Sequence, residues 1–132
     1  MARETLQGSF EVTSWSEEPA PALEGTAKVT VASIGQRFSG AIEADTVADT
    51  VMTYREDGTA EFVGYQRVQG RIGDRDGSFV LQSIGSYDGS VARSQLTVVP
   101  GTATGELDGL TGIGSSEAPH GSTGTFTLQY EL

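Results

Sequence analysis

Polar and apolar residues alternate along most of this chain, and this alternation limits what the chain can fold into. A period of two places successive side chains on opposite faces of a β-strand, whereas an amphipathic helix repeats every 3.6 residues. Thr, Val, Tyr and Phe, which suit a pleated and half-buried surface, are frequent in these segments. The pattern predicts strands within residues 9–15, 27–31, 38–42, 47–54, 61–68, 79–81, 95–99 and 125–130.

Turn residues separate these segments. An Asp-Gly pair occurs at residues 57–58, 76–77, 88–89 and 108–109. Because both residues tolerate the positive φ of tight turns, each pair predicts a hairpin. We expect residues 17–21, with two prolines, to end the first strand, and the glycine-rich residues 101–114 to form a turn and a bent strand. The short links predict antiparallel strands in meander order.

A long meander exposes two unpaired edges unless its first and last strands pair. About eight strands suffice to close a barrel whose interior is filled or holds one small ligand. A sandwich is the alternative, but its long Greek-key links have little room in this spacing. The sequence therefore predicts an all-β fold, a single closed antiparallel barrel of about eight strands, which forms one domain over residues 1–132.

Charge and composition exclude several classes of function. The formal net charge is -10 and the isoelectric point is about 4.3, so the chain repels nucleic acid. There is no cysteine for a disulfide or a thiolate metal site. The chain has no apolar run of membrane-spanning length. Its first residues contain no apolar stretch as long as that of a signal peptide, and Glu4 interrupts them. We therefore expect no membrane association and a cytoplasmic location.

Several segments together resemble a known family. They are residues 8–19, 57–64, 77–82, 98–101, 104–110 and 125–132, in this order along nearly the whole chain. Through these segments the sequence resembles the bacterial domain-of-unknown-function family 3224. The resemblance implies a closed β-barrel similar to allene oxide cyclase and dirigent proteins, which fold reactive small molecules inside a barrel. Gln66 and Ser83 stand where many members place Glu and His, which puts any chemistry of those residues in doubt here.

The strand around residue 65 carries polar groups on both faces. One face has Glu61, Tyr65 and Arg67, and the other has Gln66 among apolar residues. An inward carboxylate beside Tyr or Arg has to be hydrogen-bonded or change its pKa, which makes it a candidate for function. A charge ladder on the outer surface is the alternative. Alternation cannot decide between them, because a one-residue bulge reverses the faces.

The candidate catalytic residues are Glu17 and Glu61, as the acid or base of a reaction in the lumen. Aromatic rings with one polar tip, together with long polar side chains, are the candidate ligand contacts. These are Trp15, Tyr54, Tyr65, Arg67, Gln82 and Tyr130, of which Tyr54, Tyr65 and Arg67 would orient the substrate.

The single histidine, His120, lies between Pro and Gly and is either a solvated loop residue or an acid or base at the barrel rim. Asp74 and Asp76 resemble the start of a calcium loop, but the bidentate Glu that such a loop needs later is missing. We therefore expect a turn there, and neither a metal site nor a cofactor.

Three hypotheses for function remain. The first is a cofactor-free isomerase or cyclase that holds one conformer of a hydrophobic small molecule and excludes water. The second is a barrel that binds or carries such a molecule without chemistry. The third is a structural protein that forms a homo-oligomer through the outer face of its sheet.

Overall fold

The computed structural model describes residues 3–119 and 122–132, and this part of the chain forms nine strands and no helix. Hence no helix in it is long and apolar enough to span a membrane. The strands are β1 (Glu4–Pro19), β2 (Lys28–Gly40), β3 (Ile42–Tyr54), β4 (Ala60–Ile72), β5 (Arg75–Tyr87), β6 (Ala92–Val98), β7 (Thr104–Gly105), β8 (Thr111–Ala118) and β9 (Thr123–Glu131).

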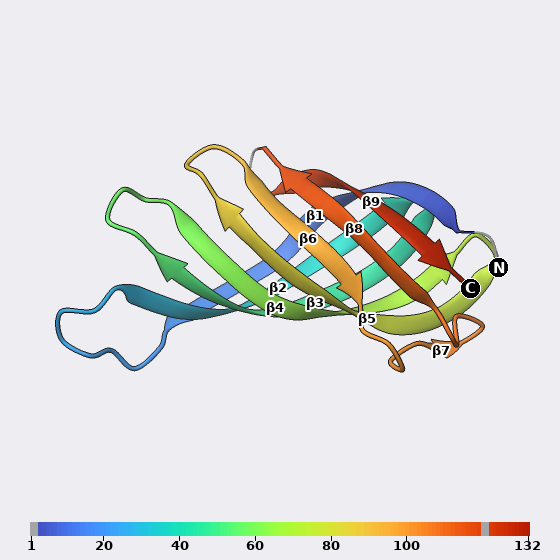
Figure 1. Ribbon diagram of the computed structural model, residues 1–132, viewed down its shortest axis with the longest axis horizontal. Helices are drawn as coiled ribbons and strands as arrows, with labels where there is room; N and C mark the ends of the chain where they lie inside the picture. Colours follow the sequence, from blue (N-terminus) through green and yellow to red (C-terminus); the bar gives the residue numbers. More distant parts are fainter. Residues whose placement is uncertain (1–2, 120–121) are drawn as a thin grey trace.

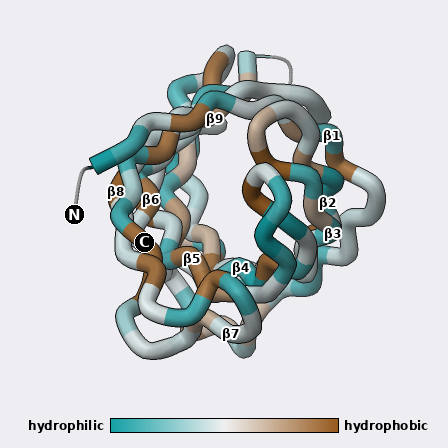
Figure 2. Tube along the Cα trace, turned by 90° about the vertical axis from the view of Figure 1, so that its right-hand side faces the viewer, coloured by the Kyte–Doolittle hydropathy of each residue, from teal (hydrophilic) through white to brown (hydrophobic). Residues whose placement is uncertain are grey.

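Eight of the strands close into an antiparallel barrel, as the alternation predicted. Sequence neighbours pair from β1 to β6, then β6 pairs with β8, β8 with β9, and β9 with β1. Because these pairings include β4 with β5, each of the eight strands has a partner on both sides. The two-residue β7 lies outside this ring and pairs with the first part of β5. Figure 1 shows the strands running obliquely along the barrel, and Figure 2 shows the ring viewed from one end.

The Asp-Gly pairs at residues 57–58 and 88–89 lie in hairpin turns, with φ of +87° at Gly58 and +99° at Gly89. The pair at residues 108–109 lies in a turn, with φ of +88° at Gly109, but not in a hairpin as predicted, because β7 pairs with β5 and β8 with β6 and β9. The prediction for residues 76–77 was wrong, because that pair lies within β5. Ile72 pairs with Arg75, so residues 73–74 form the two-residue turn instead. Its first residue is a glycine with φ of +61°, where a type II′ turn requires one.

The first strand ends within residues 17–21, as predicted. β1 continues to Pro19, which pairs with Thr30. The β1–β9 ladder ends at Glu11, and Val12 N–H still donates to the Ser122 carbonyl. Beyond Val12, β1 pairs only with β2 among residues 3–119 and 122–132, which makes its other side an edge. Proline lacks an N–H group and is tolerated at such an edge.

The main core fills the end of the barrel at which the two chain termini lie (Figure 1). The segment between β6 and β8 returns to this end and buries Leu107 and Leu110, each 1% exposed. We call residues 104–110 the plug. The other half of the barrel contains only a smaller cluster, built on Ala32, Ile34 and Met52. This half is therefore not filled by its own side chains.

Candidate functional site

A cavity of about 680 Å³ occupies the less filled half of the barrel. All eight barrel strands contribute to its lining, and Ser90, Pro119 and Ser122 come from loops around its mouth. The volume lies within the range of about 300–1,000 Å³ that is usual for small-molecule sites. No charged side chain lines it among the residues that the structure describes.

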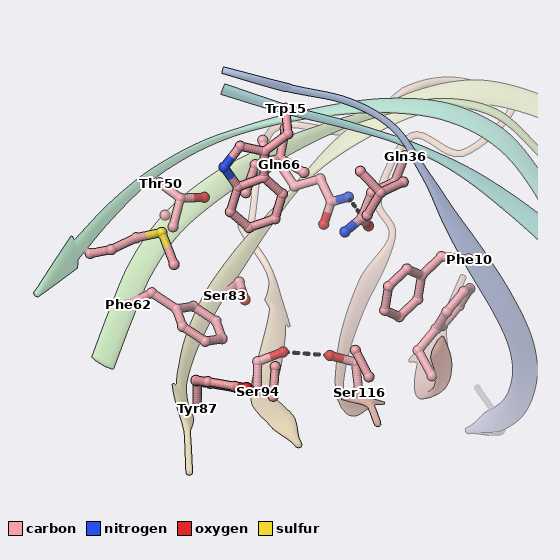
Figure 3. A pocket seen from close by; sticks show the side chains of 18 of the residues that line it. Phe10, Trp15, Gln36, Thr50, Phe62, Gln66, Ser83, Tyr87, Ser94 and Ser116 are labelled. Carbon is pink, nitrogen blue, oxygen red and sulfur yellow. Dashed lines mark hydrogen bonds between the residues drawn. The ribbon is translucent and has the colours of Figure 1, made fainter. Parts of the chain in front are cut away.

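The cavity exists because one wall carries small side chains. An eight-stranded barrel is just wide enough for side chains to fill its interior. On β5, β6 and β8 most of the lining residues are small, and only Tyr87 and Leu96 are large. The small ones are Ser83, Ala92, Ser94, Ser116 and Ala118. Ser94 lies directly opposite Ser116, and their hydroxyls are hydrogen-bonded to each other. Figure 3 shows these serines across the cavity from Trp15 and Thr50.

A β-bulge in β1 decides which residues enter the site. The register with β2 shifts between Val12 and Ser14. Before the bulge, Phe10 and Val12 line the cavity, whereas after it Trp15 does. Glu17 then pairs with Ala32, whose side chain is buried inside the barrel, so Glu17 is on the inner face as well.

Glu17 accepts three side-chain hydrogen bonds beside the cavity. Trp15 Nε1 donates to Oε1 at 3.0 Å, while Thr30 Oγ1 at 2.6 Å and the Tyr54 hydroxyl both donate to Oε2. Partial burial raises the pKa of Glu17, but these hydrogen bonds outweigh it and the net pKa is lowered. Burial and the bond to Glu17 raise the pKa of Tyr54. The site thus contains a carboxylate whose ionised form is favoured by hydrogen bonds from Thr30, Tyr54 and Trp15.

Four of the predicted site residues lie on the outer face. Glu61 forms an ion pair with Arg55, and Arg67 forms one with Asp49 at 2.9 Å. The Gln82 amide lies 3.5 Å from the hydroxyl of Tyr65. Tyr65 is 53% exposed on this outer face and also borders the cavity. Of the two arrangements left open for β4, the charge ladder on the outside is the observed one.

Tyr130 faces inward, but at the other end of the barrel. It packs against the main core and borders a second, more polar depression with Glu4 and Arg75. Burial and a hydrogen bond with Glu4 raise the pKa of its hydroxyl. The structure therefore brings together Trp15, Glu17 and Tyr54 but separates them from Tyr130.

Sequence reasoning missed the amides and hydroxyls that do line the cavity. These are Gln36, Thr50, Ser94 and Ser116, together with Gln66 and Ser83, the two positions at which the sequence departs from the family pattern. For Gln66 a signal was available in the sequence, because Gln66 lies on the same face of its strand as the apolar Phe62. His120 lies outside the described residues. Within those residues no three His, Asp or Glu side chains form a group that could hold a metal ion.

Comparison with known proteins places this barrel in a family. The family model described as "Protein of unknown function (DUF3224)" matches residues 6–130. The chain belongs to the DUF3224 family. A crystal structure of a DUF3224 protein with unknown function from Shewanella oneidensis MR-1 is 26% identical. The match covers 99% of this chain and 98% of that one, with a TM-score of 0.79. No curated protein matches this DUF3224 chain in sequence.

Proposed function

We propose that this DUF3224 protein binds a neutral, mostly apolar small molecule in the barrel cavity. The observation that carries the proposal is the cavity of about 680 Å³ with no charged side chain in its described lining. Phe10, Phe62 and Met52 supply the apolar contact surface. Burial of apolar ligand surface provides roughly 25 cal/mol per Å² before the costs of association.

The absence of lining charge argues for a neutral ligand. A charged ligand would lose its hydration on entering and would find no opposite charge on the described lining. The net charge of -10 adds a repulsion against anions. Glu17 offers little to a cation, because Trp15, Thr30 and Tyr54 already donate to its oxygens.

The first test is thermal unfolding with a panel of neutral probes (phenanthrene, retinol and hexadecanol) and with hexadecanoate as a charged counterpart. A probe at about a hundred times its Kd should stabilise the fold by about 2.7 kcal/mol. For 132 residues this corresponds to about 10 °C in Tm. Trp15, the only tryptophan, lines the cavity, so its fluorescence should report the same binding.

Two neighbouring serines provide a matched pair of variants. Ser116 lines the cavity, whereas Ser115 is exposed on the outer face of β8. Ser116→Phe should narrow the cavity and weaken probe binding, while Ser115→Phe should bind as the wild type does. Both should unfold cooperatively. The proposal is contradicted if no neutral probe binds to the wild type, or if Ser116→Phe binds the probes unchanged.

A second candidate is the cofactor-free isomerase or cyclase, and one observation favours it. The Tyr54 hydroxyl borders the cavity and is hydrogen-bonded to Glu17, so a proton donor and a carboxylate meet at its wall. However, a lowered pKa weakens Glu17 as a base and a raised one weakens Tyr54 as an acid, so binding is the better-supported function. Loss of turnover with retained binding in Tyr54→Phe would establish the second candidate.

A further inference from the structure

Two glutamines and a threonine form a hydrogen-bonded cluster at the cavity wall. Gln66 is only 6% exposed and Thr46 only 5%, so both are nearly shut off from solvent. Gln66 Nε2 lies 3.0 Å from Gln36 Oε1 and 2.8 Å from Thr46 Oγ1. Gln36 and Gln66 line the cavity, and Figure 3 shows their amide groups next to each other. Among the described residues, Gln66 is the most buried polar side chain that lines the cavity.

The hydrogen bonds fix which way each amide points. Thr46 donates its single hydroxyl proton to the backbone oxygen of Gln36, at 3.0 Å. Thr46 Oγ1 can therefore only accept from Gln66, which requires the amide nitrogen of Gln66 at that place. The second proton on this nitrogen goes to Gln36, so the Gln36 atom facing it is the oxygen. Both protons of Gln66 Nε2 are thereby used.

Each amide keeps one group for the cavity. Gln66 Oε1 and Gln36 Nε2 have no protein partner among residues 3–119 and 122–132. In the same part of the chain, no buried side-chain nitrogen or oxygen that is closed to solvent is left without a partner. These two atoms are therefore open to the cavity. One is an acceptor and the other a donor, on adjacent side chains.

We propose that the ligand carries a lactam or primary amide, and that its N–H donates to Gln66 Oε1 while its carbonyl accepts from Gln36 Nε2. This inference rests on the proposed function, because it names the chemistry of the molecule bound in the same cavity. A buried acceptor left without a donor costs about as much as a lost hydrogen bond, so an apolar ligand without this group binds less well. An ionised carboxylate offers two acceptors and would oppose Gln66 Oε1.

The test is calorimetric titration of the wild type with three ligands of the same ring system. Phenanthridinone has both the N–H and the carbonyl, its N-methyl derivative has only the carbonyl, and phenanthrene has neither. We expect phenanthridinone to bind about tenfold more tightly than its N-methyl derivative, the loss expected for one unsatisfied buried acceptor. Phenanthrene should bind more weakly than both.

Variants on β4 separate the cluster from general effects of substitution. Gln66→Met removes the acceptor, so phenanthridinone and its N-methyl derivative should bind equally. Gln69→Met makes the same change at an exposed position of the same strand and should keep the tenfold ratio. Gln36→Met should remove the advantage of the N-methyl derivative over phenanthrene. Gln36→Met therefore still tests the inference if Gln66→Met does not fold.

The outcomes distinguish this inference from the proposed function. If phenanthrene binds and phenanthridinone binds no more tightly than its N-methyl derivative, the inference is overturned and the binding function stands. The same follows if the tenfold ratio persists in Gln66→Met. If none of the three ligands binds to the wild type, the proposed function fails and takes the inference with it.

Discussion

Truncation of Leu107 should destabilise the barrel without affecting the cavity. Leu107 is 1% exposed, belongs to the main core, and lies in the plug at the end of the barrel away from the cavity. Leu→Ala at a fully buried site costs about 3 kcal/mol, from lost burial and the void that remains. An unfolding entropy of about 2.1 cal/mol/K per residue over 132 residues gives about 0.28 kcal/mol/K. Leu107→Ala should therefore lower Tm by about 11 °C.

The assay is calorimetric and urea-induced unfolding of the wild type, Leu107→Ala and the control Leu23→Ala. Leu23 is 75% exposed in the loop after β1, so the same truncation there should change stability by less than about 0.5 kcal/mol. Probe affinity should be unchanged in both variants. A loss of under about 1 kcal/mol at Leu107 would refute the role of the plug in the core. A loss of probe binding would refute the separation of the two ends.

Three further predictions concern the strands. The folded-state pKa of Glu17 lies below its ordinary value of 4.5, so its stabilising effect is complete above pH 4.5 and lost as pH falls through the folded pKa. Urea unfolding should show a weaker pH dependence in Glu17→Gln, and parallel curves would contradict this. Gly70→Ala should cost about 1–3 kcal/mol in urea unfolding, because its Cβ would meet the Glu43 carbonyl oxygen at 2.0 Å; an unchanged stability would refute that close approach. Glu61→Gln breaks the exposed pair with Arg55 and should change stability by under about 1 kcal/mol and leave probe binding unaltered, whereas loss of binding would restore Glu61 as a site residue.

The fold was predictable because its causes are local. Alternation repeats in nearly every strand, and turn glycines such as Gly58 and Gly89 have the positive φ that the Asp-Gly pairs suggested. Closure of the strands into a barrel could be predicted because unpaired strand edges are unfavourable. The turn predicted at residues 76–77 was wrong, because Gly77 pairs with Gly70 within the β4–β5 ladder and the turn lies at residues 73–74 instead.

The site was only partly predictable, because it depends on which face of each strand turns inward. Trp15 and Glu17 enter the site through the bulge after Val12. The sign of this bulge in the sequence is the change of the apolar residues from even positions, Phe10 and Val12, to the odd position of Trp15. In β4 the alternation separated Glu61 from Gln66 correctly but could not say which of them faces the lumen. The register with β3 and β5 decides it.

Polarity is a poor guide to the inside of this barrel, and side-chain size is a better one. Val51, Val63 and Ile84 pair across β3, β4 and β5 and are 46%, 44% and 54% exposed on the outer face. Ser94 and Ser116 face inward, although their hydroxyls make them look like surface residues. A packed lumen needs volume, so small inward residues on three neighbouring strands leave a space that their own chain cannot fill. A closed barrel with such a wall either collapses locally or accommodates a ligand, and the hydrogen-bonded Ser94–Ser116 pair on adjoining strands holds the wall in place.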